Sequence, residues 1–151
     1  MKNKTLLDRA KADLFVAKSM LEYVLTDELQ YDIVAYHTQQ SIEKAMKFAM
    51  QCEGIEFLWV HDVDKLFQQM ESNNLEPPEW IWDNRKILID YATQTRYGTD
   101  LVATKRDVVN LLQLSEKYIL DIEQQQQQQQ IFNNAATKST AIPPKNNGTI
   151  S

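Results

Sequence analysis

Cysteine, glycine and histidine are scarce in this chain of 151 residues, which has one cysteine, three glycines and two histidines. The single cysteine, Cys52, cannot close an intramolecular disulfide and has no cysteine or histidine at the spacing of metal ligands around it. So few glycines leave no loop that cradles a phosphate and no nucleophile elbow. These absences exclude most familiar enzyme classes, and we expect neither a metal site nor a cofactor.

Long hydrophobic runs are also missing. The N-terminus starts with basic residues but reaches Asp8 and Arg9 directly after Leu6 and Leu7, so it lacks the apolar region of a signal peptide. Apolar residues make up 43% of the chain and charged residues 25%, as in an ordinary soluble domain with one core. We predict a cytoplasmic protein that does not contact a membrane.

The charge balance is acidic, with 16 Lys or Arg against 21 Asp or Glu and a formal net charge of −5. Only Lys138 and Lys145 are charged after residue 123, so residues 1–123 carry a formal charge of −7. Binding to long nucleic acids depends on clustered Lys and Arg that neutralise phosphates. Because the chain lacks such an excess, a phosphate site would have to be local.

The composition changes abruptly at Gln124, the first of seven consecutive glutamines. The segment that follows has only four large apolar residues, which are Ile131, Phe132, Ile142 and Ile150. So few apolar side chains do not offset the entropy that is lost on ordering. The sequence therefore predicts one folded domain at residues 1–123 and a disordered low-complexity tail at 124–151, into which the last helix can extend by a turn or two.

Few helix breakers and apolar residues at helical spacing predict an all-α fold. We expect five helices, at about residues 5–25, 32–52, 62–72, 79–98 and 104–122. Thr5 with Asp8 and Thr104 with Asp107 resemble capping boxes at two of the starts, and Gly54 suits a C-terminal cap. The short connections favour an antiparallel up-and-down helical bundle.

A polar stripe on the second predicted helix is the first candidate site. Helical spacing places four polar side chains near one face: His37, Gln40, Lys44 and Lys47. The alternative is an ordinary solvated face, in which Glu43 and Lys47 form a surface ion pair. Gln39 and Gln40 are unusual there, because amides beside apolar residues must find hydrogen-bond partners.

Further candidates lie at the ends of the following helices. His61 precedes the third predicted helix, where an imidazole usually caps or bonds locally and less often catalyses. Arg96 and Tyr97 close the fourth, where the cation either favours the helix dipole or holds a phosphate through two parallel hydrogen bonds. The three tryptophans are able to stack on bases, but large aromatics more commonly close one end of a bundle.

The segment Tyr36–Lys47 resembles the core of a known family. Its sequence, YHTQQSIEKAMK, is similar to the aromatic-His-x-Gln-Gln-x-x-Glu-Lys-x-x-Lys pattern of HEPN domains, which are small helical modules of prokaryotes and some eukaryotes. Three further features follow in the family order: Ala12-Asp13-Leu14, His61 with Leu66, and Thr95-Arg96-Tyr97. The resemblance covers about residues 5–123 and leaves the tail outside.

The resemblance implies an α-helical bundle that usually dimerises and is often encoded beside a minimal nucleotidyltransferase. Some branches of the family are toxins that cut RNA through an Arg-x4–6-His motif. Here the three positions at that spacing after Arg96 are Leu101, Val102 and Ala103, so the histidine is missing. Metal-independent RNA cleavage needs a group that takes the 2′-hydroxyl proton and a cation for the phosphate, and Arg96 supplies only the second.

These observations leave more than one function open. The leading hypothesis is a HEPN-type homodimer that binds a nucleotide or phosphate group, docks a minimal nucleotidyltransferase, or both. Its candidate ligand-binding residues are His37, Gln40, Lys44, Lys47, His61, Arg96 and Tyr97, with no catalytic residue and no metal ligand assigned. The alternative is an atypical metal-independent ribonuclease toxin of a toxin–antitoxin pair, in which His37 or His61 replaces the missing base. A purely structural dimer is the third possibility.

Overall fold

The computed structural model describes residues 3–23, 26–57, 61–97 and 103–140, with the side chains of residues 92–97 excepted. Six helices follow one another along the chain: α1 (Leu6–Leu21), α2 (Glu28–Cys52), α3 (Val63–Ser72), α4 (Glu79–Trp82), α5 (Arg85–Tyr97) and α6 (Lys105–Thr140). These ranges contain no strand, which confirms the all-α prediction. None of the described helices is long and apolar enough to cross a bilayer.

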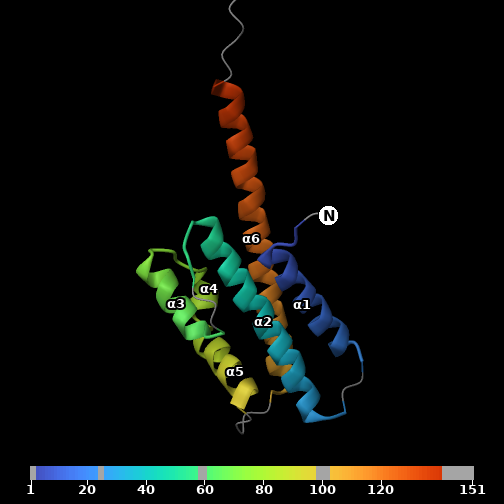
Figure 1. The fold of residues 1–151 in the computed structure, drawn as a ribbon. Coiled ribbons are helices and arrows are strands. Elements are labelled where there is room, and N and C mark those ends of the chain that lie inside the picture. The colour runs from blue at the N-terminus through green and yellow to red at the C-terminus, as the bar shows by residue number, and fades with distance from the viewer. Residues whose placement is uncertain (1–2, 24–25, 58–60, 98–102, 141–151) are drawn as a thin grey trace, which may run out of the picture.

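α2 is the central helix of the bundle. It packs against α1, α3, α5 and α6, and Figure 1 shows α1 on one side of it and α3 on the other. α1 and α6 run antiparallel, because Lys11 near the start of α1 pairs with Glu123, while Lys18 near its end pairs with Glu116. The core draws apolar side chains from all six helices, among them Leu14, Met46, Leu66, Ile81, Leu88 and Ile119.

Several helix ends follow the capping residues in the sequence. Thr5 and Asp8 form a reciprocal capping box at the start of α1, as predicted. Thr104 and Asp107 make the same pair of hydrogen bonds at the start of α6. Gly54 follows the end of α2 with a φ of 69°, a conformation that glycine adopts without the strain a Cβ would cause.

Three helix boundaries within the bundle differ from the prediction, and the first is the end of α1, at Leu21 rather than near residue 25. α2 begins at Glu28 rather than near residue 32, because Asp27 and Gln30 form a capping box one turn earlier. The predicted fourth helix is divided into α4 and α5, where the side-chain amide of Asn84 donates to the carbonyl oxygen of Trp80 at 2.7 Å. Asn side chains that bond to nearby backbone compete with helical hydrogen bonds and favour a turn.

The glutamine segment is helical, which corrects the prediction of a disordered tail from residue 124. α6 continues to Thr140, so residues 124–140 form a helical arm that projects past the end of the bundle (Figure 1). Gln and Ala are good helix formers, and the arm contains neither glycine nor proline. All its side chains after Gln126 are exposed. The rest of the predicted tail, residues 141–151, lies outside the described ranges.

The bundle is expected to fold without the arm, as the sequence predicts for residues 1–123. At the base of the arm, the amide of Gln126 bonds to Sγ of Cys52 at 3.1 Å, and partial burial raises the pKa of this thiol. A single neutral hydrogen bond contributes only about 1 kcal/mol. We therefore expect a chain that ends at Gln125 to keep a cooperative thermal transition, with a melting temperature lowered by less than about 8 °C.

Circular dichroism measures this change at the lowest workable concentration, where association between copies contributes least. A larger fall in melting temperature would show that the arm packs on its own bundle.

Candidate functional site

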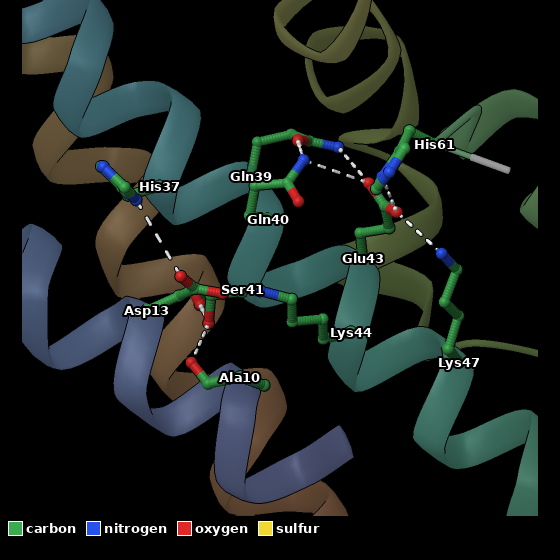
Figure 2. Close-up of polar contacts among 11 residues, drawn as sticks. Ala10, Asp13, His37, Gln39, Gln40, Ser41, Glu43, Lys44, Lys47 and His61 are labelled. Carbon is green, nitrogen blue, oxygen red and sulfur yellow. Dashed lines mark hydrogen bonds and ion pairs between the residues drawn. The ribbon is translucent and has the colours of Figure 1, made fainter. Parts of the chain in front are cut away.

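A buried carboxylate, Glu43 of α2, is the centre of a first polar cluster (Figure 2). Its Oε1 accepts a hydrogen bond from Nζ of Lys47 at 2.8 Å and lies 3.1 Å from Nδ1 of His61. Its Oε2 accepts from the amide nitrogens of Gln39 and Gln40, each at 3.4 Å. We call these five residues the Glu43 cluster.

The Glu43–Lys47 pair is buried, which corrects the expectation of a solvated surface pair. The side chains of Glu43 and Lys47 are 1% and 5% exposed, and the ring of Phe57 lies 5.8 Å from the Lys47 ammonium. The physical reason is that four helices pack around α2 and leave it little solvated face. A carboxylate at such depth stays charged only when cations and hydrogen-bond donors surround it.

His61 joins the loop before α3 to α2. An ionised carboxylate only accepts hydrogen bonds, so Nδ1 of His61 carries the hydrogen that points at Glu43. Nε2 then remains as the nitrogen that meets an outside partner, and the side chain is 62% exposed. His61 does not cap α3, since the carboxylate of Asp62 accepts from the backbone N–H of Lys65.

Asp13 of α1 is the centre of a second cluster. Its Oδ2 pairs with Nζ of Lys44, and its Oδ1 lies 3.9 Å from Nδ1 of His37. These side chains are half-buried, at 20% exposure for Asp13, 29% for Lys44 and 33% for His37. The ring of Tyr36 meets that of His37 edge-on, with 5.6 Å between the centroids. We call Asp13, His37 and Lys44 the Asp13 cluster.

A buried serine holds the helix that carries both clusters. The hydroxyl of Ser41 donates to the carbonyl oxygen of Ala10 on α1 at 2.8 Å and lies 2.9 Å from the hydroxyl of Ser115 on α6. Both serines are fully buried. This contact fixes α2 against two neighbours, so every member of the two clusters except His61, which lies in the loop before α3, is held on a packed helix.

The polar residues of α2 follow the order of the HEPN pattern. In the fold they contact two different neighbours, which are His61 in the loop before α3 and Asp13 on α1. The family profile of the HEPN domain matches residues 4–125. The chain belongs to the HEPN family. The match includes α1 to α5 and the part of α6 within the bundle, and it leaves nearly the whole arm outside. No curated protein and no solved structure matches the chain in the corresponding searches.

This HEPN domain divides the predicted polar stripe in two. Gln40 and Lys47 belong to the Glu43 cluster, whereas His37 and Lys44 belong to the Asp13 cluster. Both lysines are thus paired with carboxylates. Among the described residues no group of three His, Cys, Asp or Glu side chains is placed to hold a metal ion.

The remaining predicted site residues, Arg96 and Tyr97, are the last two residues of α5. α5 ends at the end of the bundle where α2 begins (Figure 1). Their side chains lie outside the part of the chain that the structure describes. Their role in ligand binding stays a prediction.

Two carboxylates of the site were not among the predicted site residues. Glu43 carries a sequence signal, because Gln39, Glu43 and Lys47 at positions i, i+4 and i+8 form a polar row along the helix. Asp13 interrupts the apolar spacing of α1 between Ala10 and Leu14. Glu43 orients His61 through a hydrogen-bond contact, whereas Asp13 mainly pairs with Lys44.

Proposed function

We propose that this HEPN protein is a homodimeric binding module that holds the phosphate of a nucleotide against α2. The observation that carries the proposal is the contact that orients His61. Its Nδ1 lies 3.1 Å from the buried carboxylate of Glu43, whereas Nδ1 of His37 lies 3.9 Å from Asp13, beyond hydrogen-bond distance. The ring of His61 therefore offers Nε2 to a partner, and a protonated imidazole donates from that nitrogen to a phosphate oxygen.

The charge distribution supports a small ligand rather than long RNA. Residues 1–123 carry a formal charge of −7, and Lys44 and Lys47 are neutralised by Asp13 and Glu43. Such a surface repels an extended polyanion, whereas one phosphate needs only a few local donors. Arg96 is the guanidinium that we assign to the same ligand. By resemblance to its family, a minimal nucleotidyltransferase is the protein partner, in the cytoplasm.

The test is calorimetric titration of nucleoside mono-, di- and triphosphates and of inorganic phosphate into the full chain. We expect binding of at least one nucleotide and an affinity about tenfold lower in His61→Ala, because one charge-assisted hydrogen bond is lost. Gln68→Ala, on the exposed side of α3, is the matched control and should bind like wild type. If neither nucleotides nor phosphate bind the wild-type chain, the binding function is wrong and a structural dimer remains.

A ribonuclease is the second candidate, favoured by the contact between Glu43 and His61. A carboxylate that orients an imidazole through Nδ1 leaves Nε2 as a base, the arrangement used by catalytic triads. Such a base takes the 2′-hydroxyl proton of RNA. Expression of the wild-type chain and of His61→Ala in bacteria, with a cleavage assay on labelled RNA in EDTA, separates the functions. A wild-type chain that neither slows growth nor cuts RNA excludes this alternative.

A further inference from the structure

One long side of the molecule, where α1 lies beside α6, keeps large apolar side chains in solvent. Phe15 of α1 is 73% exposed and Leu120 of α6 is 56% exposed. Both line a groove between the two helices, flanked by the ion pairs Lys11–Glu123 and Lys18–Glu116. We call this groove the α1/α6 face. Apolar side chains that gather in solvent mark a surface for another molecule.

The apolar line of this face continues along α6 onto the arm. Ile131, which is 69% exposed, follows Leu120 by three helical turns and lies on the same side of the helix. Six residues form a row along this side of α6, separated alternately by four and three positions: Leu120, Gln124, Gln127, Ile131, Asn134 and Lys138. We call this row the seam; Leu120 and Ile131 are its two apolar members, and the other four residues are polar.

The arm has little support within its own chain. Every side chain after Gln126 is exposed, so the tertiary packing that gives most helices in proteins their stability is missing there. Ion pairs along the helix do not stabilise it either, because Lys138 is its only charged residue. Packing of Ile131 against a second helix would supply the tertiary contact that the arm lacks.

We propose that a second copy of this chain packs antiparallel along α6, so that Ile131 of each protomer lies on Leu120 and Phe15 of the other. The inference rests on the homodimer of the proposed function and names its surface. The same register sets Gln124 opposite Gln127 of the partner subunit, where the two amides hydrogen-bond to each other. A parallel pairing would instead place Leu120 of one protomer against Leu120 of the other and leave Phe15 exposed.

The charged residues of the arm and of the α1/α6 face are compatible with this antiparallel pairing. The arm brings no carboxylate and a single cation, Lys138, to a face whose lysines are already paired with Glu116 and Glu123. Few unpaired charges are then desolvated at the contact. Because both protomers use the same surface, the pairing closes with two-fold symmetry and does not grow into a filament.

Sedimentation equilibrium on the full chain tests the surface. We expect a wild-type dimer and a dimer dissociation constant raised about 100-fold or more in Leu120→Glu, which places two carboxylates in the seam. Leu29→Glu is the matched control, since Leu29 is 64% exposed on α2, away from the α1/α6 face, and should leave the dimer intact. Thermal unfolding verifies that both variants are folded.

Disulfide cross-linking tests the antiparallel register. In a Cys52→Ser background, Leu120→Cys with Ile131→Cys should form a covalent dimer under mild oxidation. Leu120→Cys alone should not, because the two cysteines then lie about 16 Å apart along the seam, too far for a disulfide. A dimer that survives Leu120→Glu, or one that Leu120→Cys cross-links by itself, overturns this surface and leaves the homodimer standing. A wild-type chain that is monomeric overturns both the surface and the homodimer. Nucleotide binding is tested separately, by the calorimetric titration.

Discussion

Replacement of Glu43 by alanine is expected to lower the free energy of unfolding by about 3–5 kcal/mol, the usual cost of removing one partner of a buried ion pair. The ammonium of Lys47, only 5% exposed, would lose the carboxylate that lies 2.8 Å away. The amides of Gln39 and Gln40 would lose the same acceptor. Urea denaturation monitored by tryptophan fluorescence measures the change.

Two further variants show whether burial causes this loss. Asp13→Ala removes the carboxylate of the half-buried pair with Lys44, and we expect a cost of about 1 kcal/mol because solvent screens that pair. Glu43→Met with Lys47→Met should recover part of the stability, since apolar residues of similar volume often replace a buried pair without loss, while the amides of Gln39 and Gln40 still lack their acceptor. Equal losses for Glu43→Ala and Asp13→Ala would contradict a buried cluster.

Replacement of Arg96 by lysine is expected to weaken nucleotide binding about tenfold, although the charge is conserved. A guanidinium holds a phosphate through two parallel hydrogen bonds, and an ammonium cannot reproduce this planar contact. Arg96→Ala should lose about 10- to 100-fold, since hydrogen bonds to charged groups contribute about 1.5–3 kcal/mol. Calorimetric titration of the nucleotide that wild type binds measures both variants.

The competing role for Arg96 is that of a cation at the C-terminal end of α5. Lysine would then substitute with little loss, because the interaction with the helix dipole, about 0.3–1 kcal/mol, depends on charge and not on shape. Arg85→Lys is the matched control, since Arg85 stacks on the ring of Trp82 at 4.3 Å and has no part in the proposed site. Equal affinities for wild type, Arg96→Lys and Arg96→Ala would remove Arg96 from the site.

The sequence predicts helix ends well where a local hydrogen bond sets them. Thr5 with Asp8, Thr104 with Asp107, and Gly54 act within a few residues, so the chain itself carries the information. The early start of α2 is set equally locally, by Asp27 and Gln30, whereas the predicted start near residue 32 follows the apolar spacing of the helix. The arm extends further than the predicted turn or two, because low-complexity composition indicates disorder even where the helix propensity of the glutamines favours a helix.

Burial of the polar residues could not be derived from helical spacing alone. Spacing identifies one face of α2, whereas four other helices cover it from several sides. The partners that give Glu43 and Asp13 their roles come from distant parts of the chain, His61 for one and Lys44 for the other. Spacing therefore placed His37, Gln40, Lys44 and Lys47 on one stripe but not in their two clusters.

The glutamine tract in α6 determines the direction in which the arm presents Ile131. Each residue of an α-helix adds a rotation of about 100°, so one glutamine more or less would swing Ile131 to another side of the helix. Seven added residues would return it to within about 20° of its present direction. The tract is thus an angular spacer, in which the number of glutamines matters more than the chemistry of any one of them.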